Sequence, residues 1–265
     1  AASDVYKRQI GTVSAELVAA SITMYILCFR SKELSLRIDT GRFLPTWGVV
    51  KRALHISLPM GLQQTIMCSA YVMTTIIIAP LGTFAIAANS FGVIVESLCY
   101  MPGYGIADAA TTLVGQSIGA GRHELMKRFA WLSVGLGVTV MAVMGVVMYV
   151  GAPVAMAMMT PAEEVRRLGV EVLRIEAFAE PMFAAAIVSY GVFVGAAKTL
   201  VPSIMNLVSI WGVRISLAAL LAPSMGLRGV WIAMCIELCF RGFIFLVKLK
   251  FWNIQTSCNH YGKDQ

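Results

Sequence analysis

Charged residues are scarce in this chain. Asp, Glu, Lys and Arg make up only 13% of its 265 residues, while 58% are apolar and the mean hydropathy is +0.77. A soluble domain carries roughly 25% charged residues, so this composition excludes an ordinary water-soluble protein. The formal charge of +7 does not indicate a nucleic-acid partner, because most basic residues lie in short stretches between apolar runs.

Histidine and cysteine are also rare, with three and six residues. The histidines, His55, His123 and His260, all lie near the ends of apolar runs, and neither an HExxH motif nor a pair of catalytic acids is present. Five of the cysteines lie in or beside apolar runs without metal-type spacing, which is typical of small packing residues. The sequence therefore predicts no enzyme, no metal site and no cofactor.

Long apolar runs account for the composition. A bilayer core of roughly 30 Å is crossed by about 20 apolar residues in a helix, so runs of this length predict transmembrane helices. We expect an all-α polytopic membrane protein with about seven transmembrane helices. The runs lie at about 10–29, 56–80, 84–116, 129–152, 170–196, 203–222 and 229–249.

Basic residues predict the orientation of these helices. Lys and Arg gather in 30–55, in 117–128, at Lys198 and after 247, and these stretches all fall on one side of the membrane. The connections on the other side hold only Arg166, Arg167 and Arg228. Because cytoplasmic loops are enriched in Lys and Arg, the basic side and the C-terminal tail 251–265 are expected to be cytoplasmic.

Two short regions differ from the spans. Residues 1–9, AASDVYKRQ, are interpreted as a non-native leader and are left out of fold reasoning. Residues 30–55 mix charge with Pro45 and Trp47, which favours a linker whose helix lies along the membrane surface.

Proline and glycine predict irregular helices. The run 84–116 is too long to cross the core as one straight helix, and MPGYG at 101–105 is expected to kink it unless it projects. Pro59 and Pro181 fall inside two other runs. Broken helices are frequent in transporters, although proline is common in transmembrane helices generally.

Acidic residues inside apolar runs are the main functional candidates, because a carboxylate in a membrane is costly. Glu96, Glu180 and Glu237 fall near mid-depth of their runs, and Asp108 lies nearer the cytoplasmic end. They are candidates for binding a proton, Na⁺ or a cationic substrate. The alternative is neutralisation inside the protein, for which Arg241, four residues after Glu237, and Arg214 are available.

Other acids and polar residues have lesser predicted roles. Glu171 and Glu176 are expected nearer the outer surface, paired with Arg174. Buried amides and indoles need hydrogen-bond partners, so further residues are candidates for lining a cavity or joining helices. These candidates are Gln63, Gln64, Asn89, Asn206 and Trp211.

An ordered set of motifs resembles the MATE (multidrug and toxic compound extrusion) family of exporters. The motifs are LPMGLQQ at 58–64, PLGTFAIAANSFG at 80–92, MPGYGIADAATTLVGQSIGAGR at 101–122, EPMFAAAIVSYGVFVGAAKTLVPS at 180–203 and GLRGVWIAM at 226–234. The resemblance covers roughly residues 10–250. Its GQSIGAG stretch at 115–121 is expected to form a helix end with a left-handed glycine cap.

The resemblance implies a two-lobe transporter with a central cavity that opens alternately to each side. Residues 10–29 would then be the last helix of the N-terminal lobe, 30–55 the interlobe linker and 56–250 the six-helix C-terminal lobe. The missing N-terminal lobe and the lipid bilayer would be partners. The location implied is the bacterial cytoplasmic membrane.

The function implied is export of small cationic or amphipathic drugs in exchange for H⁺ or Na⁺. This sequence departs from some sodium-coupled relatives, which carry an acid in the helix that corresponds to 56–80. Gln63 and Gln64 stand in that run instead, and Lys198 stands where many relatives have Asp. The coupling ion therefore stays open.

Three other functions were weighed. An intramembrane enzyme lacks a recognisable set of catalytic residues, and a seven-helix receptor is suggested only by the number of spans. A lipid-linked polysaccharide flippase shares the lobed architecture, but basic residues would be expected to line its cavity. The mid-depth residues here are mostly acidic, which favours cationic cargo.

Overall fold

The computed structural model describes residues 2–30 and 46–252, and these residues divide into two units, 1–51 and 52–265. In the first unit, α1 (Ala2–Tyr25) continues into a π-helical turn, Ile26–Arg30. The predicted surface linker 30–55 lies partly outside the described residues, and its last part is the start of α2. The predicted tail 251–265 lies outside them from residue 253 onward.

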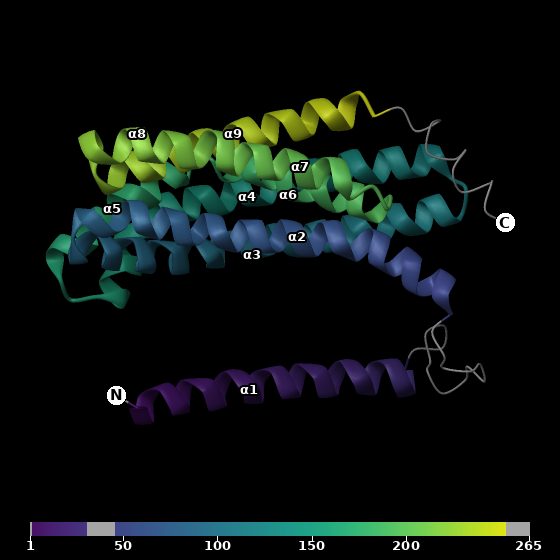
Figure 1. Ribbon diagram of the computed structural model, residues 1–265, viewed down its shortest axis with the longest axis horizontal. Coiled ribbons are helices and arrows are strands. Elements are labelled where there is room, and N and C mark those ends of the chain that lie inside the picture. The colour runs from purple at the N-terminus through teal and green to yellow at the C-terminus, as the bar shows by residue number, and fades with distance from the viewer. Residues whose placement is uncertain (1, 31–45, 253–265) are drawn as a thin grey trace. The chain divides into compact units, whose positions relative to one another are not determined.

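The second unit is a bundle of helices that run in alternating directions (Figure 1). The turn between α3 and α4, the connection from α6 to α7 and the end of α9 lie at one end of this bundle. The helices are α2 (Trp47–Ile78), α3 (Thr83–Gly119), α4 (His123–Met159), α5 (Glu163–Glu176), α6 (Glu180–Gly195), α7 (Leu200–Val208), α8 (Ser216–Met225) and α9 (Leu227–Lys250).

Two short irregular segments complete the bundle. A single 3-10 turn, Ala79–Leu81, links α2 to α3, and a π-helical segment, Ser209–Ile215, joins α7 to α8 into one continuous span. Glycines with positive φ make the tight turns between long helices: Gly121 (φ 69°) precedes α4 and Gly226 (φ 60°) precedes α9. The predicted glycine cap after GQSIGAG is therefore present.

Length and composition allow five described helices to cross a membrane, or six when α5 and α6 count as one bent span. These include each predicted span from residue 56 onward. The remaining prediction, 10–29, forms most of α1, which is not among them. As a helix, α1 carries Asp4, Lys7 and Arg8 at its start and Glu16 in its middle, and the apolar residues 26–29 belong to the π-helical turn that follows it.

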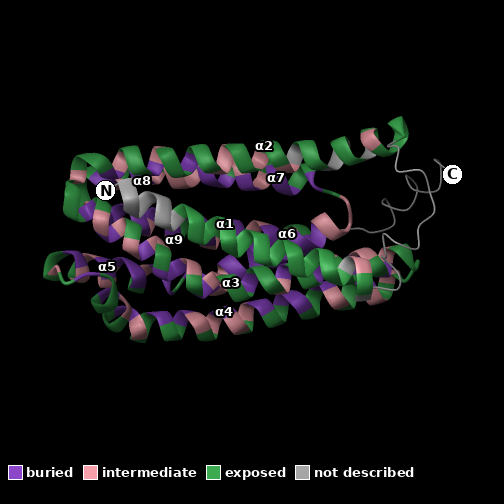
Figure 2. Ribbon diagram, turned by 90° about the horizontal axis from the view of Figure 1, so that it is seen from below, coloured by how far each residue is buried: buried purple, intermediate pink, exposed green. Residues whose placement is uncertain are grey.

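The core of the bundle is built around α6. This helix packs against α3, α4 and α9, and it is buried along nearly its whole length (Figure 2). Small residues allow the close approach: a Cβ at Gly191 would lie 2.6 Å from the carbonyl oxygen of Ala107 on α3, and Gly195 meets Thr111 in the same way. Thr111 Oγ1 also donates a hydrogen bond of 2.9 Å to Gly191 O. Small residues four apart are a common means of joining membrane helices.

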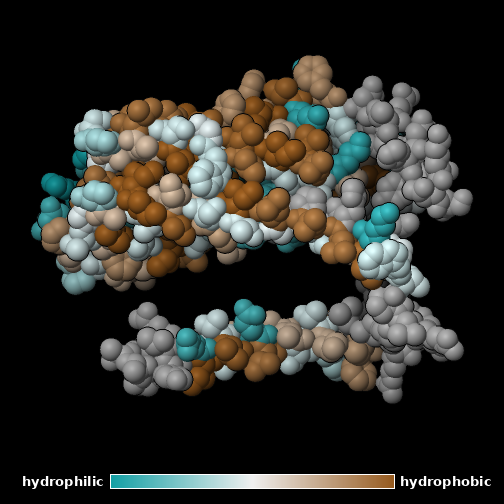
Figure 3. Space-filling view, viewed as in Figure 1, coloured by the Kyte–Doolittle hydropathy of each residue, from teal (hydrophilic) through white to brown (hydrophobic). Residues whose placement is uncertain are grey.

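The outer surface of the bundle is apolar. On the face drawn in Figure 3, hydrophobic side chains cover much of the bundle and hydrophilic ones lie mostly toward its ends. Large side chains such as Leu98, Leu132 and Val150 are about two-thirds exposed. A soluble protein would not display this much apolar surface, whereas a lipid-facing helix does.

Candidate functional site

A break between α5 and α6 forms the centre of the site. The two helices meet at 59° across residues 177–179, and Pro181 occupies the first turn of α6, where its missing N–H costs no helical hydrogen bond. The predicted interruption near Pro181 is thus observed. The helix α4 approaches closely at Gly145, where a Cβ would lie 2.7 Å from the carbonyl oxygen of Ala177.

Four buried glutamates gather around this break. Glu176 ends α5 and Glu180 begins α6, while Glu96 comes from α3 and Glu237 from α9. Their exposed fractions are 8% or less, and the charge of Glu96 acts on both Glu176 and Glu180. So many carboxyl groups in a buried membrane site are costly and call for a compensating function or partner.

Glu237 has the most complete set of partners. Ser209 Oγ, at the start of the π-helical segment, donates a hydrogen bond of 2.6 Å to Glu237 Oε1. Arg241 Nε lies 3.1 Å from the same oxygen, an ion pair one helical turn along α9. The Arg241 guanidinium carbon also lies 5.5 Å from the ring centre of Phe183 on α6. The charge of Glu237 is therefore neutralised by Arg241, which lies four residues later on the same helix.

Arg214 supplies a second positive charge. It belongs to the π-helical segment and lies close enough to interact electrostatically with Glu96 and Glu176. Its guanidinium carbon lies 5.8 Å from the ring centre of Tyr71 on α2. Two departures from regular α-helix therefore position charged groups in the site. Arg214 lies in the π-helical segment, and Glu176 and Glu180 flank the α5–α6 break. The name carboxylate cluster is used below for Glu96, Glu176, Glu180, Glu237, Arg214 and Arg241.

Buried polar atoms without a hydrogen-bond partner among the described residues are concentrated in the carboxylate cluster. Both side-chain oxygens of Glu176 and of Glu180 are buried without a hydrogen-bond partner among the described residues. Buried polar atoms are rarely left in this state, because each costs free energy. These four oxygens are therefore suited to take a proton or to bind a cation.

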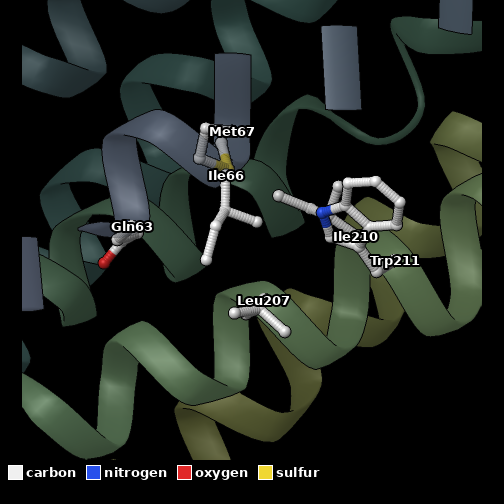
Figure 4. A pocket seen from close by; sticks show the side chains of 6 residues that line it. All are labelled: Gln63, Ile66, Met67, Leu207, Ile210 and Trp211. Carbon is white, nitrogen blue, oxygen red and sulfur yellow. The ribbon is translucent and has the colours of Figure 1, made fainter. Parts of the chain in front are cut away.

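A narrow slot lies beside the carboxylate cluster, between α2 and the α7–π segment (Figure 4). Ile66 and Met67 of α2 face Leu207 and Trp211 across it. Gln63 also lines the slot, and its Oε1 accepts a hydrogen bond of 3.0 Å from Tyr190 OH. Gln63 and Trp211, which the sequence offers as cavity-lining residues, thus both line this apolar slot.

The remaining predicted residues lie elsewhere. Asn89 Oδ1 accepts a hydrogen bond of 3.1 Å from Trp231 Nε1, which joins α3 to α9. Asn206 is buried on α7, and Gln64 is exposed on α2. Asp108 is exposed on α3 and no contact brings it into the carboxylate cluster. Among the described residues, no group of three or more His, Cys, Asp or Glu could hold a metal ion.

The position of Glu176 corrects an expectation. It was placed near the outer surface beside Arg174, but it is 1% exposed, and Arg174 instead lies over the ring of Tyr149 at 5.2 Å. Glu171, little more than one turn earlier, does reach the surface, where Arg228 Nη2 lies 2.6 Å from its Oε2. No sequence pattern signals the burial of Glu176, because helical spacing does not extend across the bend between Glu176 and Glu180.

The apolar bundle, the broken span and the buried charges define a polytopic α-helical membrane protein with the fold of a transporter lobe. Residues 59–220 match the MatE family model, which covers more than half of the chain, so the chain belongs to the MatE family. The recognised motifs at 58–64 and 180–203 lie within or at the edge of this match.

Curated relatives cover most of this chain. It is 27% identical over 90% of its length to the "Probable multidrug resistance protein NorM" of Thermotoga maritima. It is 29% identical over 84% of its length to a protein of the same name from Xylella fastidiosa. These matches cover 51% and 48% of the relatives, so the chain spans about half their length.

Solved transporters share the fold. A MOP superfamily transporter from Pyrococcus furiosus superposes with a TM-score of 0.79 at 18% identity, covering 88% of this chain and 53% of its own. A multidrug resistance MATE family transporter in an outward-facing conformation gives the same values. At this identity the likeness establishes the fold, and the substrate has to be argued from the site.

Proposed function

We propose that this chain is half of a secondary antiporter that exports cationic or amphipathic drugs in exchange for H⁺ or Na⁺ by alternating access. The observation that carries this proposal is the pair of unpartnered glutamates, Glu176 and Glu180, at a broken helix inside an apolar bundle. Such a site has few structural uses, and intramembrane carboxylates mark ion and substrate pathways.

The charge balance of the carboxylate cluster supports a cationic ligand. With all groups ionised, four glutamates outnumber the two arginines, and the pair Glu237–Arg241 is already neutral. The surplus negative charge falls on Glu96, Glu176 and Glu180, with Arg214 as their nearby counter-charge. A proton, Na⁺ or a drug cation would restore neutrality, and competition between them would couple the two fluxes.

The broken helix supplies a means of movement. The helices of the bundle differ in how tightly they pack. The helix α6 is buried nearly throughout. By contrast, α2 has a mostly exposed surface and meets α7 across the apolar slot. Cation binding at Glu180 would change the charge at the first turn of α6 and so bias its angle to α5. Rocking of one part of a transporter against another around a fixed site is the general form of alternating access.

The relatives support export of drugs in particular, since two of them are named as multidrug resistance proteins. Their greater length supports an organisation in which residues 10–29 end one lobe, 30–55 form the linker and 56–250 form the other lobe. The basic stretches support a bacterial cytoplasmic membrane location with the C-terminus inside. No enzymatic activity, metal or cofactor belongs to the proposal.

The test is transport by the full-length protein in membrane vesicles. Efflux of a cationic dye is measured under an imposed proton gradient and, separately, an imposed sodium gradient. We expect efflux under at least one gradient and its loss when that gradient is collapsed by an ionophore. Absence of dye movement under both gradients, with protein of normal abundance, would overturn the multidrug assignment.

A further inference from the structure

A second pocket lies at the end of the bundle that carries the α3–α4 turn. It has a volume of about 430 Å³ and lies between the first turns of α4 and the end of α9. The site shares no lining residue with the slot beside the carboxylate cluster. Its lining comes from residues 126–131 and 249–252.

The pocket combines an apolar base with aromatic walls. Met126, Ala130 and Leu249 are each buried and form the base. Trp131 lines the pocket from α4 and is about half exposed, and Trp252 lines it from the residues after α9. Tryptophan is enriched where a membrane protein meets the lipid headgroups, because its ring has an apolar body and a polar N–H.

Two lysines provide the charge. Lys127 and Lys250 both line the pocket and both are exposed. Glu124 lies 3.7 Å from Lys127 Nζ but is 87% exposed in its side chain, so solvent screens its charge and the pocket stays net positive. In addition, Trp252 Nε1 is buried without a hydrogen-bond partner among the described residues. The site thus offers two ammonium groups and a spare N–H donor above an apolar base.

From this chemistry we infer that the pocket binds the headgroup of an anionic phospholipid. The phosphate interacts with Lys127 and Lys250 at the rim, and the glycerol and first acyl carbons pack on Trp131 and the apolar base. Basic pockets between membrane helices at the cytoplasmic face favour acidic headgroups in general. The inference does not depend on the carboxylate cluster or on any transport activity.

The test compares lipids on the purified full-length protein in detergent. Native mass spectrometry counts bound phosphatidylglycerol and, separately, phosphatidylcholine with the same acyl chains. We expect phosphatidylglycerol to bind about tenfold more tightly, and the double variant Lys127→Gln, Lys250→Gln to lose this preference. Trp252→Phe, which removes the N–H donor and keeps the ring, should weaken phosphatidylglycerol binding about threefold.

The matched control removes the same charge at the other end of the bundle. Arg166→Gln with Arg167→Gln should keep the preference, and thermal unfolding should be unchanged in both double variants. Equal binding of the two lipids, or a preference that survives loss of both lysines or disappears equally in the control, overturns the proposal. Soluble glycerol phosphate binding as tightly as the lipid would assign the pocket to free phosphate instead. A preference that is lost on removal of residues 253–265, with both lysines intact, would assign the binding to that segment and overturn the proposal.

Discussion

Two glutamates on α5, Glu171 and Glu176, are little more than one helical turn apart and have opposite surroundings. Glu171 is partly exposed and forms an ion pair with Arg228 at the end of the bundle. Glu176 is 1% exposed and neither of its oxygens has a hydrogen-bond partner among the described residues. A glutamate side chain is thus solvated at residue 171, whereas its burial at residue 176 costs free energy.

The difference shows how charge is distributed in this protein. Exposed ion pairs contribute between about 0 and 1 kcal/mol, so Glu171 can vary with little effect on folding. A buried carboxylate without partners lowers stability and persists only where its chemistry is needed. We therefore regard Glu176 and Glu180 as functional and Glu171 as a surface feature, and a set of variants tests this contrast.

The largest effect is expected from Glu180→Gln in the full-length protein. Glutamine has nearly the same shape but carries no negative charge and takes up no proton at neutral pH, so resistance and dye efflux should be abolished. Growth on a cationic drug and dye efflux are measured at matched protein abundance. The control Glu171→Gln should retain nearly full efflux. Full resistance in Glu180→Gln cells at normal expression would exclude this residue from the coupling site.

Removal of a buried counter-charge should have the next largest effect. Arg241→Met leaves Glu237 with only Ser209 as its partner, and breaking a buried pair costs about 3 kcal/mol. The midpoint of thermal unfolding in detergent should fall by roughly 5–10 °C. The surface counterpart Arg228→Met should change it by less than about 2 °C.

A second variant separates charge from packing in that pair. Glu237→Gln combined with Arg241→Met removes both charges, so much of the lost stability should return. If the single variants at Arg241 and Arg228 unfold at the same temperature, the contrast between buried and surface pairs is wrong. If the double variant is no more stable than Arg241→Met, the loss reflects the contact of Arg241 with Phe183 instead.

The sequence predicts the helices of the bundle better than the site. Hydrophobic length alone locates each span from residue 56 onward, and glycine chemistry locates the turn at Gly121. The start of a new helix near Pro181 is consistent with the preference of proline for the first helical turn. The MPGYG motif predicts a kink in its helix, or a helix that projects from the membrane. In the structure α3 continues as one helix of 37 residues past Pro102, and Pro102 lies on an exposed face. At about 55 Å, α3 is longer than a bilayer core and projects from it.

The burial of Glu176 could not be predicted from the sequence, because it depends on how the helices pack. Helical periodicity assigns a face only while the helix is continuous, and the 59° bend changes the direction of the chain between Glu176 and Glu180. Arg174 was chosen as a partner from its nearness in sequence, but it turns toward Tyr149 on α4. Which residues face one another across α3, α5, α6 and α9 depends on how these helices pack, and no local pattern specifies that.

The close packing at the break can be tested directly. Gly145→Leu would place side-chain atoms against the Ala177 carbonyl and within 3.3 Å of Glu180 Cβ, since even a Cβ meets them there. Overpacking of this kind costs about 2 kcal/mol, so thermal unfolding should begin several degrees lower and efflux should decrease. Gly135→Leu, on the same helix with open space around it, is the control. Equal stability of the two variants would contradict the close approach of α4 to the break.

The smallest effect is expected at the surface pair itself, and salt distinguishes it from the buried one. Glu171→Gln should lower the thermal midpoint by less than about 2 °C, and this difference should vanish in about 1 M NaCl, where the Debye length is about 3 Å. The loss caused by Arg241→Met should persist at the same salt, because Glu237 is fully buried and ions do not reach it. A salt-sensitive loss at Arg241 would mean that water enters the carboxylate cluster. The surplus negative charge would then be solvated, and the main reason to assign it a transport role would be lost.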